Sequence, residues 1–288
     1  MRKITETIEK IKPIDARILR RTQRRLDSLT KPKGSLGRLE ELAKTVVAIT
    51  GKENPILDRK VIFTMVGDHG VARQGVSAFP QEVTVQMVYN FLQEGAAINV
   101  LARAVGAKVL VIDMGVAGEI KPSKKLINKK VASGTQDMVK GSAMSRRQAL
   151  QSIKGGIEIF EEEAATYGVD IAGTGDMGIA NTTSSSAIVA CITGSRVQDV
   201  TGRGTGIDDE KLRRKIEVIE KALKVNQPDP RHPLDILSKV GGFEIGGLVG
   251  CILAAAAHRV PILIDGFIST ASALIACELC PFLKDYLI

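Results

Sequence analysis

The chain has 288 residues, of which 44% are hydrophobic, 25% are charged and 3% are aromatic, with no tryptophan. This composition is ordinary for a globular protein and excludes a disordered or low-complexity chain. The length accommodates one large α/β domain and a smaller element around an aliphatic core. No apolar run reaches the ~20 residues that span a membrane, and the start of the chain lacks the apolar stretch of a signal peptide. We therefore expect a cytoplasmic protein with no membrane partner.

The net charge of +8 favours anionic partners without identifying them. Much of the excess lies between Arg17 and Lys33, where apolar residues recur at helical spacing among the arginines. Aromatic residues, on which nucleic-acid bases stack, are missing from this stretch. The segment therefore predicts a solvated amphipathic helix and no nucleic-acid partner.

The four cysteines do not form a metal-binding pattern. Cys277 and Cys280 make one C-x-x-C pair, and neither a second pair nor a nearby histidine completes the four ligands of a zinc site. The pair also ends an apolar helical run, whereas a redox motif begins a helix. We expect thiols in a reducing compartment, with no metal site and no cofactor.

In chain order, the first fifty residues predict two helices, over residues 15–29 and 36–50, around a loop rich in Pro and Gly. We expect residues 1–55 to form an N-terminal helical element that is part of a small domain. Beyond them, apolar runs alternate with helical periodicity. Strands are predicted over residues 61–66, 108–114, 169–172 and 260–264, and helices over residues 81–105, 145–167, 182–193, 208–223, 245–258 and 269–280.

Apolar strands separated by helices are typical of a parallel sheet that is covered on both faces. Residues 56–288 are therefore predicted to form one α/β domain. Ligands in such folds bind at the carboxyl ends of the strands, near a topological switch point. Three of the predicted strands end in loops rich in Gly and Asp, so we expect the site there.

The most informative segment runs from Gly173 to Ser186, where closely spaced glycines follow a strand and hydroxyl residues follow the glycines. Glycines let backbone N–H groups approach a phosphate, and a helix start carries partial positive charge. The segment predicts an anion site, although a glycine turn with an ordinary Ser/Thr cap explains the pattern equally well. Its G-x-G-x-x-G spacing matches the dinucleotide fingerprint, which is weak when taken alone.

A second glycine cluster, Thr201 to Gly206, precedes an acidic helix start. Arg203 and Lys215 are predicted to clamp one phosphate, Arg203 through its planar fork and Lys215 as a point charge. The alternative is a solvated basic face on an ordinary helix, and the pattern by itself favours this alternative slightly.

Three residues at strand ends are further candidates. Asp68 and His69 are adjacent and point to opposite faces, so they are not expected to form a direct acid/base pair. Asp68 is a candidate ligand or hydrogen-bond acceptor, and His69 is equally well explained as a structural histidine. Asp265 ends a strand, where functional carboxylates of α/β sheets occur, or else caps the following helix.

Taken together, these segments resemble the nicotinate-nucleotide–dimethylbenzimidazole phosphoribosyltransferase family. The matching runs occur in the family's order from about residue 15 to the end, at residues 29–40, 67–71, 75–80, 83–88, 178–183, 202–206 and 265–270. Several separate runs in one order are far more specific than any single motif. The resemblance implies a Rossmann-like parallel sheet flanked by helices, a small helical domain and a homodimer.

The implied reaction moves phosphoribose from nicotinate mononucleotide onto 5,6-dimethylbenzimidazole, giving α-ribazole 5′-phosphate for the lower ligand of cobalamin, and nicotinate. No cofactor is implied. The implied phosphate site comprises Gly175, Gly178, Asn181, Thr182, Arg203, Gly204 and Lys215. The implied base pocket involves Ser77, Phe79 and Gln86, and we add Asp265 as a substrate-binding residue. Asp176 and Lys215 are the expected catalytic residues.

Two departures from the family's pattern matter. Asp176 stands where the family usually has Glu, and no Gly-Glu-Gly-Thr-Gly-like loop, whose glutamate is the implied general base, follows Ile288. An active transferase would use Asp176 or a partner group as the base. The alternative is a truncated, catalytically impaired nucleotide- or base-binding homologue. An NAD-dependent oxidoreductase is the weakest reading, because no acid ends a strand about twenty residues beyond Gly178.

Overall fold

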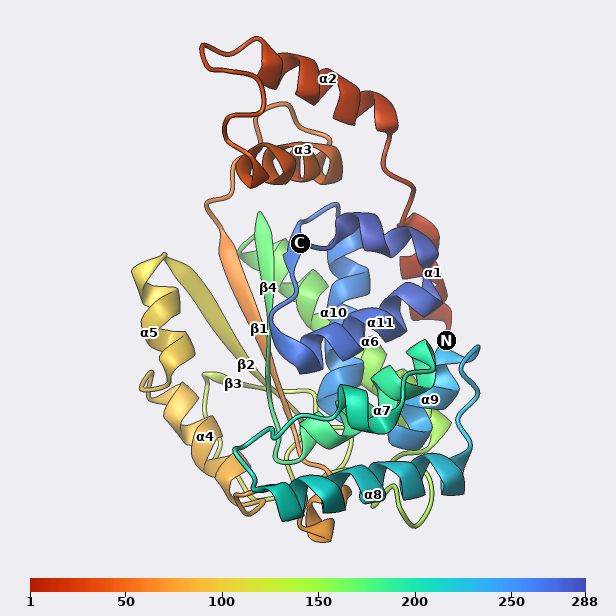
Figure 1. Ribbon diagram of the computed structural model, residues 1–288. Coiled ribbons are helices and arrows are strands. Elements are labelled where there is room, and N and C mark those ends of the chain that lie inside the picture. The colour runs from red at the N-terminus through yellow and green to blue at the C-terminus, as the bar shows by residue number, and fades with distance from the viewer.

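The computed structural model describes residues 1–288 and contains a five-stranded, fully parallel sheet (Figure 1). The strand order is β3-β2-β1-β4-β5. The strands are β1 (Lys60–Gly67), β2 (Ala107–Gly115), β3 (Leu126–Asn128), β4 (Ile171–Met177) and β5 (Ile262–Leu263). The central strands are apolar because they are buried on both faces, which confirms the predicted parallel α/β sheet.

Helices cover the two faces unequally. The helices are α1 (Arg2–Lys10), α2 (Ala16–Asp27), α3 (Arg38–Thr50), α4 (Val83–Leu92), α5 (Ala97–Ala104), α6 (Arg146–Thr166), α7 (Asn181–Thr193), α8 (Asp209–Asn226), α9 (Pro233–Val240), α10 (Phe243–Ala257) and α11 (Gly266–Leu279). On one side, at the left of Figure 1, α4 and α5 pack on β1 and β2. On the other side, α10 packs on the sheet and is itself covered by α6 and α11, so this side holds the main hydrophobic core.

Most of the predicted elements are confirmed within a few residues, but one predicted helix is wrong, one strand ends later than predicted, and three short elements were not predicted. The single helix predicted over residues 81–105 is wrong, because the chain turns at Glu94, whose φ is 63°, and at Gly95 before α5 begins. Helices α1 and α9 and the short edge strand β3 were not predicted. Each is short, and its position depends on contacts with distant parts of the chain.

The third predicted strand ends later than expected. Residues 173–177 belong to β4, because Gly173 and Gly175 continue the parallel pairing with Ile62 and Thr64 of β1. The glycines that were predicted to form the loop therefore lie inside the strand. The loop itself begins at Gly178.

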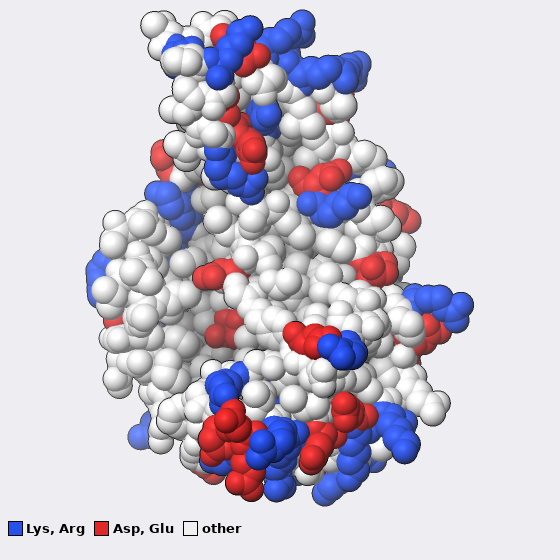
Figure 2. All heavy atoms as spheres, in the orientation of Figure 1, with Lys and Arg blue, Asp and Glu red and all other residues white.

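The first helices separate into two groups. Helix α1 packs against α6 and α10, and Ile4 and Ile11 are buried in the main core. Helices α2 and α3 pack on each other and lie together at the top of Figure 1. Figure 2 shows Lys and Arg side chains gathered on this upper end, where α2 displays a basic outer face. No helix in the structure combines the length and the apolar composition needed to cross a membrane.

Candidate active site at the carboxyl ends of β1 and β4

The switch point of the sheet lies between β1 and β4. From β1 the chain adds β2 and β3 on one side, and then crosses to the other side of β1 to form β4 and β5. Sheets of this kind usually bind their ligands in a crevice beside the loops that follow the two strands at the switch point. In Figure 1 this end of the sheet is at the bottom, beside α8. Most of the predicted site residues lie in the loops here.

The loop after β4 packs directly on the end of β1. A Cβ placed on Gly178 would lie 2.1 Å from the carbonyl oxygen of Gly67, so no larger residue fits without moving the loop. Ala180 then adopts a left-handed conformation, with φ 73°, and α7 begins at Asn181. The close approach fixes where α7 begins, and the start of a helix carries partial positive charge that suits an anion.

Asp176 lies near the end of β4 and is partly buried. Its Oδ1 accepts a hydrogen bond of 2.8 Å from the side-chain amide of Asn181. Burial, and after it the charge of the nearby Glu244 carboxylate, raise the pKa of Asp176 to about 7, against the opposing effect of the Asn181 hydrogen bond. This carboxyl group therefore changes its charge near neutral pH.

Lys215 joins the two glycine-rich clusters. It projects from α8, is only 1% exposed, and donates hydrogen bonds of 2.8 Å to Oγ1 of Thr182 and 3.1 Å to the carbonyl of Gly202. Gly204 lies beside the same ammonium group. Burial lowers the pKa of Lys215 to about 8, and no carboxylate forms an ion pair with it. A buried cation without an anionic partner, at the start of α7, is suited to hold an anion.

Arg203 is turned away from Lys215 in the structure. Its guanidinium donates 2.9 Å to the carbonyl of Ile207 and pairs with the Asp209 carboxylate at the start of α8. The two cations of the predicted clamp are thus not gathered around one point. Because the Arg203–Asp209 pair is largely exposed, a stronger anionic partner can replace it at small cost.

The segment predicted to form the base pocket meets the second glycine cluster. The hydroxyl groups of Ser77 and Thr205 lie 3.2 Å apart, and Oγ1 of Thr205 accepts 2.9 Å from the backbone N–H of Ala78. Phe79 is 53% exposed next to this contact, and Gln86 is exposed on α4. A strand-end loop and a helix start that are 128 residues apart in sequence are thereby brought together.

Asp265 lies at the end of β5 and precedes α11. Its backbone N–H donates 3.1 Å to Oγ1 of Thr174 on β4, and its side chain makes no capping hydrogen bond to α11. The capping alternative is therefore wrong for this side chain. Asp265 is exposed, and its charge contributes to the raised pKa of Asp176.

Asp68 and His69 have separate partners, as their adjacent positions predicted. Oδ2 of Asp68 accepts 2.8 Å from the N–H of Ala117, whereas the His69 ring contacts Ser184 at 2.9 Å and Glu244 at 2.6 Å. Glu244 and Ser184 are not among the site residues that the sequence predicts. The available signal was Glu244 itself, the one acidic residue in the otherwise apolar α10.

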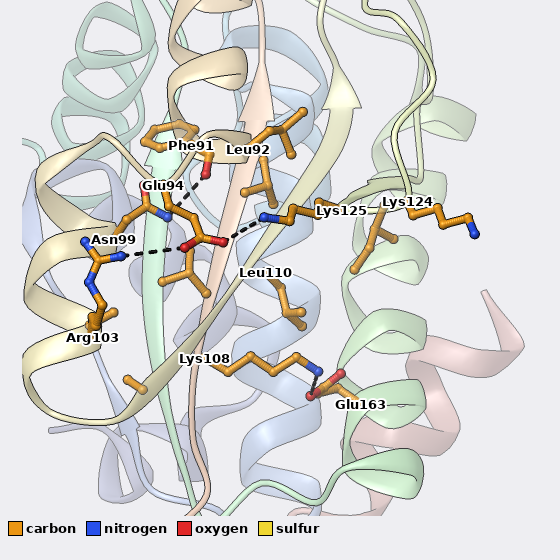
Figure 3. A pocket seen from close by; sticks show the side chains of 15 residues that line it. Phe91, Leu92, Glu94, Asn99, Arg103, Lys108, Leu110, Lys124, Lys125 and Glu163 are labelled. Carbon is orange, nitrogen blue, oxygen red and sulfur yellow. Dashed lines mark hydrogen bonds and ion pairs between the residues drawn. The ribbon is translucent and has the colours of Figure 1, made fainter.

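A cavity of about 610 Å³ lies apart from these loops, between α4, α5 and the first residues of β2 (Figure 3). Most of its charged side chains form ion pairs with one another, and Lys124 is the exception. Lys125 and Arg103 pair with Glu94, and Lys108 pairs with Glu163. None of the predicted site residues lines this cavity.

Comparison with known proteins identifies the family. A family model described as a phosphoribosyltransferase matches residues 11–288. A nicotinate-nucleotide–dimethylbenzimidazole phosphoribosyltransferase of Geobacter metallireducens is 56% identical over 284 residues, which cover 99% of this chain and 80% of that protein. One of Chloroflexus aggregans is 58% identical over 285 residues, with the same two coverages. The chain belongs to the nicotinate-nucleotide–dimethylbenzimidazole phosphoribosyltransferase family.

The fold agrees with solved members of this phosphoribosyltransferase family. The crystal structure of CobT from Thermus thermophilus superposes with a TM-score of 0.90 at 40% identity, over 94% of this chain and 81% of that one. A second structure from the same organism, named as the phosphoribosyltransferase, gives a TM-score of 0.89 at 39% identity. The predicted family and the predicted Rossmann-like sheet are both confirmed.

Proposed function

We infer that this chain transfers phosphoribose from nicotinate mononucleotide to 5,6-dimethylbenzimidazole, giving α-ribazole 5′-phosphate and nicotinate. The observation that carries this conclusion is identity of 51–58% to curated enzymes of that name over essentially the whole chain. The reaction is a pentosyl transfer, in which the bond from ribose C1′ to the pyridine nitrogen breaks and a bond from C1′ to a benzimidazole nitrogen forms. It supplies a precursor of the lower ligand of cobalamin.

We assign the nucleotide phosphate to the start of α7 and the second glycine cluster. Lys215 supplies a buried positive charge there, and Thr182 and Gly204 lie beside it. Gly178 and the first N–H groups of α7 complete the cradle. Arg203 joins the phosphate by giving up its exposed pair with Asp209.

We assign Asp176 to the transfer step, with Asn181 orienting it and Gly175 allowing β4 to pass close to Thr64. As an anion, Asp176 stabilises the positive charge that develops on the ribose in the transition state. It is also able to accept the proton that the benzimidazole loses. Both roles need the ionised form. The rate is therefore expected to fall as the pH drops below about 7, the pKa of this group.

We place the benzimidazole against Ser77, Phe79 and Gln86. The exposed aromatic ring of Phe79 offers an apolar face at the mouth of the crevice, and Ser77 and Gln86 offer hydrogen-bonding groups. Asp265 faces the crevice from the end of β5 and is assigned to substrate binding. No metal ion is required by this arrangement.

Three further features belong to the proposal. The enzyme is a homodimer, and it acts in the cytoplasm, where its four free cysteines remain thiols. We divide the chain into an N-terminal helical element, residues 1–55, and an α/β domain, residues 56–288, with α1 of the first part packed against the core of the second. The dimer would use the α4–α5 side, although Val88 and Phe91 of α4 are buried in the chain's own core and are not available to a partner.

Neither alternative function is favoured. The impaired homologue gains no support from relatives that share more than half of this sequence and are named as the active enzyme. The oxidoreductase reading rested on a glycine fingerprint whose first two glycines lie inside β4, where they pair with β1.

The test is to incubate the protein with nicotinate mononucleotide and dimethylbenzimidazole and to follow α-ribazole phosphate and nicotinate by chromatography. Equal amounts of both products are expected. NAD with a panel of alcohols serves as the control for the oxidoreductase. Lack of both products across pH 6–9, with nucleotide binding intact, would overturn the transferase assignment.

A further inference from the structure

The buried pair of His69 and Glu244 connects three elements beneath the site. Nε2 of His69, at the end of β1, lies 2.6 Å from Oε1 of Glu244 on α10, and Nδ1 lies 2.9 Å from Oγ of Ser184 on α7. The side chains of His69 and Glu244 are completely buried. Both ring nitrogens are therefore occupied, and the ring has one orientation.

The imidazole ring is also held from two sides by backbone. A Cβ on Gly242 would lie 2.4 Å from Cε1 of His69, and one on Gly178 would lie 3.6 Å from Cδ2. The ring thus fills the space between the start of α10 and the loop after β4. A shift of His69 would break its contact with Ser184, which lies on the helix that follows this loop.

The charges around the ring are unbalanced without a cation. The charges of Glu244 on α10, Asp68 after β1 and Asp176 on β4 each act on the ring, and the charge of Asp265, after β5, acts on Asp176. Oδ1 of Asp68 and Oε2 of Glu244 have no hydrogen-bond partner. His69 is the one member of this group that can carry a positive charge, and buried carboxylates need such a partner.

We propose that His69 is a positioning residue of this enzyme: paired with Glu244 as an imidazolium, it anchors the loop between Gly178 and Ser184 and neutralises Glu244, so that Asp176 enters the transfer step as an anion. The inference deepens the proposed function, because it rests on Asp176 acting in the transfer. It does not require His69 to touch a substrate.

The directions of the pKa shifts agree with this geometry. Burial on its own would lower the pKa of His69, but the charge and the hydrogen bond of Glu244 outweigh burial, and the result is raised. For Asp176, burial and then the Glu244 charge raise the pKa, whereas Asn181 and His69 lower it. If His69 alone is removed, the Glu244 charge is no longer compensated, and the pKa of Asp176 rises.

The experiment compares His69→Gln, Glu244→Gln and the double variant by the pH dependence of kcat/KM for nicotinate mononucleotide. In His69→Gln, the acid limb of the profile is expected to move up by about one pH unit, which corresponds to about 1.4 kcal/mol of lost charge compensation. The double variant is expected to return the limb to within about 0.3 unit of the wild type, since both charges are gone. His258→Gln, at the opposite end of α10, is the matched control and should leave the limb unchanged.

A purely structural pair behaves differently. If the His69–Glu244 pair only stabilised the fold, kcat would fall in all three variants, most of all in the double variant, and the acid limb would not move. That result would overturn the proposal. The double variant is informative even where His69→Gln does not fold, because a limb displaced by about one unit in the double variant contradicts the charge balance.

The second measurement uses the wild-type protein and no substrate. Nitrogen-15 NMR of labelled histidine, assigned with the His232→Gln and His258→Gln variants, reports the protonation of both ring nitrogens of His69. The proposal expects an imidazolium at pH 7, as the raised pKa of His69 indicates, and a neutral ring at that pH would overturn it. Because this readout is independent of turnover, an imidazolium in a protein without transferase activity would refute the proposed function alone.

Discussion

Replacing Lys215 with Met tests the phosphate site most directly. The substitution keeps the length of a side chain that is 1% exposed, and removes the ammonium group that bonds Thr182 and the carbonyl of Gly202. A hydrogen bond to a charged group is worth about 1.5–3 kcal/mol. The affinity for nicotinate mononucleotide is therefore expected to fall by about 10- to 150-fold, since 1.4 kcal/mol corresponds to tenfold.

The assay is isothermal titration calorimetry at two salt concentrations, with Lys211→Met as the matched control. Lys211 lies one turn earlier on the same helix and is exposed, so the control loses the same charge without touching the site. The wild type and the control should bind more weakly at high salt, because salt screens the attraction of the phosphate. Much of this salt dependence should disappear in Lys215→Met.

The pH dependence of nucleotide binding and of stability follows from the lowered pKa of Lys215, which is about 8 in the folded protein against 10.5 for an ordinary lysine. A bound phosphate favours the charged ammonium, so nucleotide binding above pH 8 should take up a proton, and the affinity should decline as the pH rises. Without nucleotide, the unfolded chain holds more protons than the folded chain between about pH 8 and 10.5, so this group makes the free protein more stable as the pH rises through that window.

Two results would refute the reasoning. One is an affinity in Lys215→Met within about twofold of the Lys211→Met control, below the smallest loss that a charged hydrogen bond predicts. The other is a binding enthalpy at pH 9 that does not change with the ionisation enthalpy of the buffer, which would mean that no proton accompanies the nucleotide.

Three further outcomes are expected. Asp176→Asn should lower kcat by about 10²–10⁴-fold and remove the acid limb near pH 7, as stopped product assays across pH 5–9 would record. Gly178→Ala places a Cβ 2.1 Å from the Gly67 carbonyl, so denaturant titration should show a loss of stability of about 1–3 kcal/mol, together with weaker nucleotide binding. Light scattering at micromolar concentration should give twice the chain mass of 30.9 kDa. Leu101→Glu, on the exposed face of α5, should shift that mass toward the monomer if this face forms the dimer contact.

The regular elements of the fold could be predicted because their signals are local. Apolar runs such as Lys60–Gly67 and helical periodicity such as Arg146–Thr166 depend on residues close in the chain, and Ser145 caps the latter helix as its sequence indicates. The break between α4 and α5 was missed because Glu94, not a glycine or proline, takes the positive φ there. The extent of β4 was missed because pairing with β1 overrides the turn tendency of its glycines.

The sequence by itself determined the family, the parallel sheet and the loops in which Asp176 and Lys215 lie, because those motifs are contiguous. Only the tertiary structure decided which charged groups meet. Glu244 reaches His69 across 175 positions, and Lys215 reaches Thr182 across 33, through side chains whose types carry no signal of their partners. Burial then sets the charges, since the raised pKa of Asp176 and the lowered pKa of Lys215 both arise first from removal of water. Periodicity predicts which face of an element is buried, but the electrostatics of the site depend on which faces the fold brings together.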